Sequence, residues 1–114
     1  MTSERRRVSA GNTAAAAGAA PVVPLVLTLY SSSFCGACAR TRSVLEDVTT
    51  LLPGRAVLRE VNVAAAPDES EHRGIVATPT TVLIGADGTE LARAAGVPTA
   101  PQVLALLARH LPAA

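Results

Sequence analysis

Hydrophobic and polar positions follow two different periods along the chain, and the changes of period predict where strands and helices lie. Residues 25–31 (LVLTLYS) form an almost continuous apolar run, which is typical of a strand buried on both faces. After this run, small or apolar residues recur at steps of three and four, which predicts one buried helix face. The residues of that face are Cys38, Thr41, Leu45, Val48 and Leu52. Pro53 and Gly54 are expected to end the helix.

The next two segments continue the alternation of strand and helix. Residues 56–64 (AVLREVNVA) predict a second strand, which would return parallel to the first and complete a β-α-β unit. Residues 67–75 carry acidic residues early and His72 and Arg73 late. This order of charges suits the dipole of a short helix, so we expect one here.

The last third of the chain predicts a hairpin and a final helix. Residues 80–84 and 89–94 are strand-like and flank a turn at residues 86–88. Residues 100–111 (APQVLALLARHL) form an amphipathic pattern whose inner face would carry Val103, Leu104, Leu107 and Leu111. The predicted order of elements is therefore β-α-β-α-β-β-α.

The chain of 114 residues has the length of one domain. We expect residues 1–22 to be a flexible N-terminal tail, because they show no apolar periodicity and are rich in Ala, Gly, Ser and Thr, and residues 23–114 to form the domain. Three Arg residues precede the apolar segment, as in a signal peptide. Cleavage there would remove the first core strand, so we do not expect one. The sequence contains no Pro-free apolar run of about 18 residues, so we expect no transmembrane span.

Charge excludes two classes of partner. The formal net charge is only +1, which provides no overall attraction to nucleic acid or to an anionic membrane. We therefore expect neither of them as a partner.

The two cysteines are the strongest chemical signal in the sequence. Cys35 and Cys38 are separated by Gly36 and Ala37, and the pair lies where the first strand passes into the first helix. Disulfide exchange needs a thiolate, and a helix N-terminus stabilises negative charge through its free N–H groups and its dipole. A cysteine at such a position can have a pKa of roughly 3.5–7.5 instead of about 8.5. We expect Cys35, at the first helical position, to attack a substrate disulfide, and the inward-facing Cys38 to resolve the mixed disulfide.

Other uses of two cysteines fit less well. A structural zinc site needs four ligands, and the sequence adds only His72 and His110, far from the pair, so we expect no metal. A structural disulfide between Cys35 and Cys38 would close a loop too small to constrain the unfolded chain much. Two core thiols that are adjacent by chance would not explain their position at a helix start.

The motifs and their order resemble the thioredoxin fold over residues 25–111. The resemblance rests on FCGAC (34–38) after an apolar strand, TPT (78–80) before the hairpin, and AAGVP (94–98) after it. It implies an α/β fold whose central mixed sheet of about four strands is flanked by helices. It also implies a thiol-disulfide oxidoreductase that uses a redox-active Cys35–Cys38 disulfide and no bound cofactor. The expected partners are protein disulfides and an upstream reductase similar to thioredoxin reductase, and the expected state is a cytoplasmic monomer.

The resemblance also implies which residues contact a substrate. They are Phe34, Gly36, Ala37, Thr78, Pro79 and Gly96. A cis peptide before Pro79 would place the Thr78 backbone opposite Cys35, where it could pair with an extended substrate segment. Given the resemblance, we expect this cis form; the alternative is a proline that simply begins a strand.

Several positions depart from the thioredoxin pattern. Phe34 stands where thioredoxins have Trp, Ala37 replaces Pro, and Leu29 occupies a position that often holds a buried Asp, which helps to deprotonate the resolving thiol. Glu60 is the only acidic residue in the two central strands and shares a face with Asn62. If it is half-buried with a raised pKa, it could accept the proton of Cys38. An exposed strand glutamate is the alternative.

Three functions remain open at this stage. The first is a thiol-disulfide oxidoreductase that acts on protein disulfides. The second is a glutaredoxin-like enzyme that uses glutathione, although the sequence lacks the Pro-Tyr dipeptide of that group. The third is a non-enzymatic thioredoxin-fold module that senses redox state or binds a partner.

Overall fold

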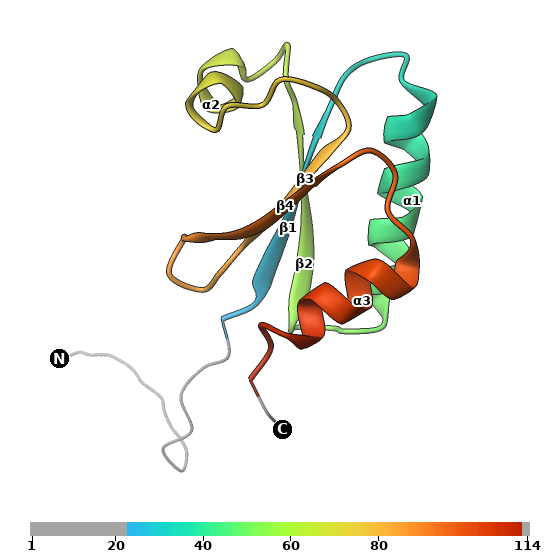
Figure 1. The fold of residues 1–114 in the computed structure, drawn as a ribbon, viewed down its shortest axis with the longest axis vertical. Helices are drawn as coiled ribbons and strands as arrows, with labels where there is room; N and C mark the ends of the chain where they lie inside the picture. Colours follow the sequence, from blue (N-terminus) through green and yellow to red (C-terminus); the bar gives the residue numbers. More distant parts are fainter. Residues whose placement is uncertain (1–22, 113–114) are drawn as a thin grey trace, which may run out of the picture.

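The first core strand runs through the middle of the molecule (Figure 1). The computed structural model describes residues 23–112. Strand β1 (Leu25–Ser31) is buried at every position except Val26, which is half-buried. Leu27 and Leu29 belong to the hydrophobic cluster on one face of the sheet, and Tyr30 belongs to the cluster on the other. The prediction of a strand buried on both faces is confirmed.

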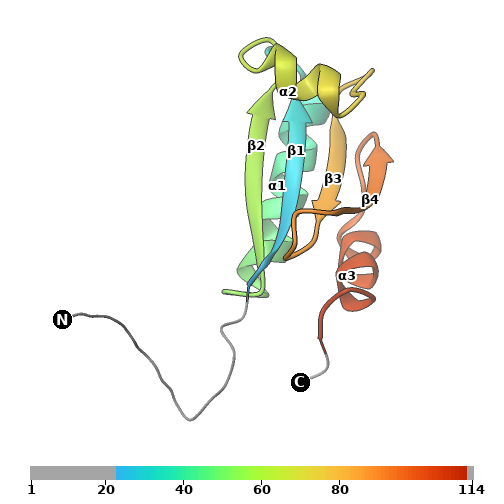
Figure 2. The same ribbon diagram turned by 90° about the vertical axis from the view of Figure 1, so that its left-hand side faces the viewer.

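Four strands form one mixed sheet in the order β2-β1-β3-β4 (Figure 2). Strand β2 (Ala56–Asn62) pairs parallel to β1, so that Leu29 lies beside Glu60. Strand β3 (Thr80–Ile84) pairs antiparallel to the other side of β1, and β4 (Glu90–Ala95) completes the predicted hairpin. The α/β architecture with a central mixed sheet of four strands is therefore as predicted.

The three helices lie on both faces of this sheet. Helices α1 (Gly36–Thr50) and α3 (Ala100–Ala108) cover one face, and the short helix α2 (Pro67–His72) lies on the other, near the carboxyl ends of β1 and β2 (Figures 1 and 2). The predicted inner face of α1 is confirmed, because Cys38, Thr41, Leu45 and Val48 are buried.

Four elements end earlier than their patterns predict; among them, helix α2 ends at His72 instead of residue 75 and helix α3 ends at Ala108 instead of residue 111. Helix α1 ends at Thr50 instead of reaching Pro53, since the residue before a proline is disfavoured in the helical region and proline has no N–H to continue the ladder. Strand β2 ends at Asn62 instead of residue 64. The Asn62 side-chain oxygen accepts the backbone N–H groups of Ala64 and Ala65, which turns the chain away from the sheet.

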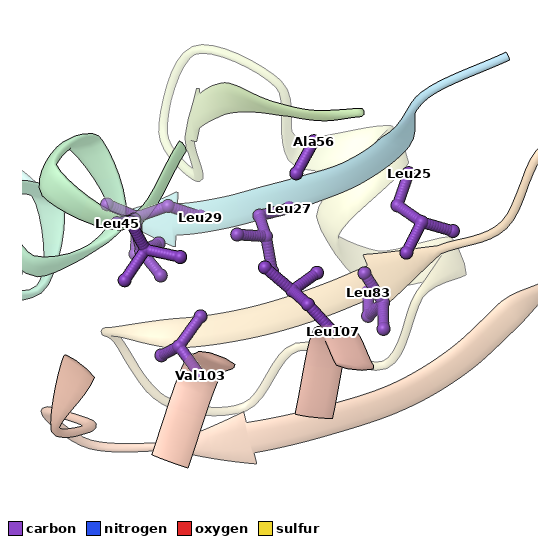
Figure 3. Close-up of a cluster of buried hydrophobic side chains, with 9 residues drawn as sticks. Leu25, Leu27, Leu29, Leu45, Ala56, Leu83, Val103 and Leu107 are labelled. Carbon is purple, nitrogen blue, oxygen red and sulfur yellow. The ribbon is translucent and has the colours of Figure 1, made fainter. Parts of the chain in front are cut away.

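The larger hydrophobic cluster fixes α1 and α3 to the sheet (Figure 3). Its buried members come from β1, α1, β2, β3 and α3: Leu25, Leu27, Leu29, Leu45, Val48, Ala56, Leu83, Val103 and Leu107. Leu104 and Leu111 pack against them and are partly buried. Each fully buried Leu or Val contributes roughly 1.5–3 kcal/mol, so this cluster is the main force that positions the start of α1.

The opposite face combines a smaller apolar cluster with charged groups. Tyr30, Val61 and Val82 are buried there. The Tyr30 hydroxyl donates to Glu69 Oε2 at 2.8 Å, and the Arg59 guanidinium donates to both Glu69 oxygens at 2.7 and 2.6 Å. These bonds, first those from Arg59 and then that from Tyr30, lower the pKa of Glu69 to about 2. The carboxylate of Glu69 thus ties α2 to β1 and β2.

Two expectations concern the ends and the membrane. The predicted flexible tail, residues 1–22, lies outside the described residues, as do the last two residues of the predicted domain. Within residues 23–112, no helix has both the length and the apolar character needed to cross a membrane.

Replacing Glu69 with Gln should lower the free energy of unfolding at pH 7 by about 1 kcal/mol. The pKa shift alone would give more, but the side chain is 32% exposed and solvent screens its charge. A carboxylate with a lowered pKa stabilises the fold above its unfolded pKa of about 4.3, and this contribution disappears as the pH falls through the folded value of about 2. Urea unfolding at a series of pH values from about 2 to 7 measures the difference in unfolding free energy between the parent and the variant.

The difference between parent and variant should shrink steadily as the pH falls from about 4 to about 2. Glu71→Gln is the matched control, because it removes the same charge from an exposed position on α2. A destabilisation by Glu69→Gln that is the same at every pH, or that is matched by the control, would contradict the role assigned to this carboxylate.

Candidate active site

The two cysteines form a disulfide at the amino end of α1, with their Cα atoms 5.2 Å apart. Cys35 is the N-cap residue, one position before the first helical residue, Gly36, so the predicted helix start was one residue early. Its backbone is extended, and its Sγ accepts the Cys38 backbone N–H at 3.0 Å. In the reduced protein this sulfur atom corresponds to the thiolate, which would replace the side-chain oxygen of an ordinary N-cap.

The two sulfur atoms differ in their access to solvent. Cys38 is fully buried, on the face of α1 that packs on the sheet, whereas Cys35 is partly exposed. The helix therefore presents one sulfur to an incoming molecule and keeps the second behind it.

The loop before Cys35 is held by polar contacts. Ser32 Oγ and Thr78 Oγ1 share a hydrogen bond of 2.7 Å, and Asn62 Nδ2 donates to Ser33 Oγ at 3.3 Å. Phe34 has a φ of 56° and is fully exposed. The left-handed region is rare for a bulky residue, and such backbone strain is concentrated at functional sites. Nothing in the sequence around Phe34 signals this conformation.

The Thr78–Pro79 segment lies next to this loop. The peptide bond between the two residues is cis, as expected from the resemblance. The Pro79 carbonyl accepts the backbone N–H of Gly96 at 3.0 Å. Gly96 has a φ of 83°, which glycine adopts without strain. Hydrogen bonds thus join three separate parts of the chain: the loop before Cys35, the cis proline and Gly96.

The remaining predicted residues also lie at this end of α1. Gly36 is exposed, and a Cβ atom added to it would meet Arg40 Nη1 only at an ordinary contact distance of 3.6 Å. Ala37 is half-buried, and its carbonyl accepts the Thr41 hydroxyl at 2.9 Å. Val76, for which the sequence predicts no role, is almost fully exposed two residues before Thr78. In the sequence, Val76 stands out only as an apolar residue between the predicted polar helix and the Thr-Pro motif.

The hypothesis that Glu60 is half-buried with a raised pKa is wrong, and the alternative, an exposed strand glutamate, is confirmed. Glu60 and Asn62 share the face of α1, as predicted from their alternation, because they lie beside Leu29 and Ser31. However, the Arg42 guanidinium donates to both Glu60 oxygens at 2.6 Å, and Ser31 Oγ donates at 2.8 Å. These hydrogen bonds, chiefly those from Arg42, lower the pKa of the carboxyl against the opposing effect of burial. An ionised carboxylate so well bonded is a poor proton acceptor.

Leu29 supplies no carboxylate either. It is fully buried in the larger hydrophobic cluster, between Glu60 on one neighbouring strand and Thr81 on the other. In the part of the chain that the structure describes, no group of three or more His, Cys, Asp or Glu side chains is placed to hold a metal ion.

Comparison with known proteins now identifies the family. A family model described as a thioredoxin-like domain matches residues 13–111. The chain belongs to the thioredoxin-like family. A thioredoxin of Chlamydia muridarum is 30% identical over 86 residues, which cover 75% of this chain and 82% of the relative. A thioredoxin of Methanocaldococcus jannaschii is 30% identical over 59 residues, which cover 52% of this chain and 69% of that protein.

Solved thioredoxin structures share the fold. Chloroplastic thioredoxin z superimposes with a TM-score of 0.69 at 26% identity, over 76% of this chain and 78% of that structure. A malaria-parasite thioredoxin-2 superimposes with a TM-score of 0.72 at 18% identity, over 76% of this chain and 84% of that structure. Family, fold and the cysteine pair at a helix start together make this thioredoxin-like chain a thiol-disulfide oxidoreductase. These parts of the sequence-based prediction are confirmed.

Replacing Glu60 with Gln should leave the resolution of a mixed disulfide nearly unchanged. Removal of a general base typically slows a step by about 10²–10⁴-fold, and the bonded Glu60 carboxylate does not act as one. Stopped-flow turnover of a model disulfide measures the rate. The ion pair with Arg42 is partly exposed, so the variant should lose no more than about 1 kcal/mol of stability.

Asp47→Asn serves as the control, since it removes a carboxylate from an exposed position on the same helix as Arg42. A resolution rate in Glu60→Gln that falls by about 10²-fold or more, with Asp47→Asn unaffected, would restore Glu60 as the proton acceptor and refute the interpretation given above.

Proposed function

We propose that this thioredoxin-like protein reduces disulfide bonds in other proteins, with Cys35 as the attacking cysteine and Cys38 as the resolving one. One observation carries the assignment. The Cys35 sulfur caps the amino end of α1 and belongs to a partly exposed residue, while Cys38 is fully buried. The helix end that holds the Cys35 sulfur favours its anionic form, which is the form that attacks a disulfide.

The reaction proceeds in two exchange steps. The Cys35 thiolate attacks one sulfur of the substrate disulfide, whose S–S bond breaks, and the released substrate thiolate takes up a proton. Cys38 then loses its proton and attacks the Cys35 sulfur, so that the Cys35–substrate bond breaks and the second substrate thiol leaves. The substrate gains two electrons and two protons, and the enzyme is left with the Cys35–Cys38 disulfide.

The surface around Cys35 suits an extended protein segment. Phe34 and Val76 offer two exposed apolar side chains, one in the loop before Cys35 and one two residues before Thr78. The segment that contains Thr78 and the cis Pro79 follows Val76 in the chain and is bonded to the loop before Cys35. The Thr78 backbone would pair with the substrate in the manner of an added strand. Gly36, Ala37 and Gly96 would keep the approach to the sulfur free of bulky side chains.

The proposal includes the conditions under which the enzyme works. A reductase similar to thioredoxin reductase would return two electrons to the Cys35–Cys38 disulfide, and no bound cofactor would be needed. The enzyme would act as a monomer in the cytoplasm, where thiols are kept reduced. The near-neutral charge of the chain is consistent with a protein that has neither nucleic acid nor membrane as a partner.

Two cysteine variants test the assignment of roles. Cys35→Ser should abolish reduction of insulin disulfides, because the accessible nucleophile is lost. Cys38→Ser should stop turnover but accumulate a mixed disulfide on Cys35, because the first exchange still occurs. Mass spectrometry of the protein after incubation with insulin, and peptide mapping of the trapped adduct, measure both results. Trapping on Cys38 by the Cys35→Ser variant, with none on Cys35 in the other, would reverse the roles.

The same assay separates the alternative functions. A thioredoxin-type enzyme should turn over insulin with NADPH and a thioredoxin reductase, and should be much slower when glutathione and glutathione reductase replace them. Faster turnover with glutathione would instead favour a glutaredoxin-like enzyme. Failure of both systems, with a cysteine pair that still oxidises and reduces reversibly, would favour a non-enzymatic redox sensor.

A further inference from the structure

Helix α1 carries its charges in the order opposite to the one that stabilises a helix. Its two cations, Arg40 and Arg42, lie in the amino-terminal half, and its two anions, Glu46 and Asp47, lie in the carboxyl-terminal half. The helix dipole favours acidic residues at the amino end and basic residues at the carboxyl end, and α2 follows that order. The cations of α1 therefore do not stabilise their own helix, and they lie toward the end that holds Cys35.

Of these two cations, Arg42 is neutralised and Arg40 is not. The Arg42 guanidinium donates to both oxygens of Glu60. Arg40 is exposed and makes no ion pair within residues 23–112. Its helix offers no partner either, because every position three or four residues away is uncharged: Gly36, Ala37, Ser43 and Val44. Arg40 thus adds an uncompensated positive charge to the surface of α1.

The Arg40 guanidinium lies over the start of the helix. Helical side chains lean toward the amino end of their helix, and Arg40 Nη1 lies 3.6 Å from the position that a Cβ atom on Gly36 would take. Gly36 directly follows Cys35, so this cation and the attacking sulfur belong to the same end of α1. The exposed acids Asp68 and Glu71 belong to α2, on the opposite face of the sheet (Figures 1 and 2).

We propose that Arg40 makes this enzyme prefer disulfides that are flanked by acidic residues. The inference rests on the proposed disulfide reduction and names the class of substrate. A protein segment that brings its disulfide to Cys35 also brings the neighbouring side chains to the first turn of α1. An acidic side chain beside the attacked cysteine gains a charged partner in Arg40, whereas a basic one is repelled. Because the pair is exposed, the preference amounts to about 2–5-fold in rate.

Three capped peptides of the form Ala-Xaa-Cys-Xaa-Ala, with Glu, Gln or Lys as Xaa, test this preference. Each peptide carries its cysteine as a mixed disulfide with 2-thiopyridine. In the reduced Cys38→Ser protein, the Cys35 thiolate attacks the peptide sulfur and the S–S bond to the thiopyridine breaks. The released thiopyridine takes up a proton, and its absorbance in stopped flow gives the second-order rate constant for each peptide.

The ratio of the Glu-peptide rate to the Gln-peptide rate isolates the charge of the substrate, because an effect of Arg40 on the thiolate itself cancels. Adding Arg40→Gln should lower this ratio about 2–5-fold and raise the ratio of Lys to Gln. Arg40→Glu should lower the Glu-to-Gln ratio further. The differences should largely disappear at 1 M salt, where the Debye length is about 3 Å.

Arg109→Gln is the matched control. Arg109 is exposed and follows the last residue of α3, which lies at the other end of the molecule from the start of α1 (Figure 1). Its replacement removes the same charge from the protein and should leave both ratios unchanged.

Three results would overturn the proposal. An unchanged Glu-to-Gln ratio in Arg40→Gln, with all peptides still reacting, would refute the preference and leave disulfide reduction standing. An equal fall of the ratio in Arg109→Gln would show that the net charge of the protein selects the substrate instead of Arg40. Failure of every peptide to react with the reduced protein would refute the proposed disulfide reduction, and this inference with it.

Discussion

The contact between the Cys38 backbone N–H and the Cys35 sulfur, 3.0 Å long, is the interaction on which this site depends. It fixes the sulfur at the one position of α1 where free N–H groups point outward and the helix dipole favours negative charge. The contact forms only if α1 begins at the residue after Cys35. The start of α1 is fixed in turn by the hydrophobic cluster beneath it, in which Leu45 and Val48 pack against β1. A redox function therefore rests on apolar packing some distance from the sulfur atoms.

Apolar and charged contacts around the cysteine pair contribute different amounts to the stability of the fold. The buried leucines and valines that hold α1 and α3 each contribute roughly 1.5–3 kcal/mol. The Arg42–Glu60 and Arg59–Glu69 pairs are partly exposed and contribute about 1 kcal/mol or less each. The ion pairs therefore add little stability and serve chiefly to fix the helices in place on the sheet. Arg42 and Glu60 join α1 to β2 near the cysteines, and Glu69 fastens α2 across the other face.

Sequence patterns were sufficient for the fold and for the cysteine pair, because both depend on periodic burial and on short-range spacing. They failed where a long-range partner decides the outcome. The alternation of β2 placed Glu60 on the correct face, but only the folded chain brings the Arg42 guanidinium to it and reverses the direction of its pKa shift. The left-handed backbone of Phe34 likewise arises from the loops around it and has no local sequence signal.

The pH profile of Cys35 alkylation tests the central claim most directly. In a Cys38→Ser variant, the rate of reaction with iodoacetamide reports the fraction of Cys35 present as thiolate. If the helix end stabilises that thiolate, the midpoint of the profile lies below about pH 7.5, and unfolding in urea returns it to about 8.5. A midpoint at or above about 8.5 in the folded protein would show that the N-cap position of Cys35 does not activate it.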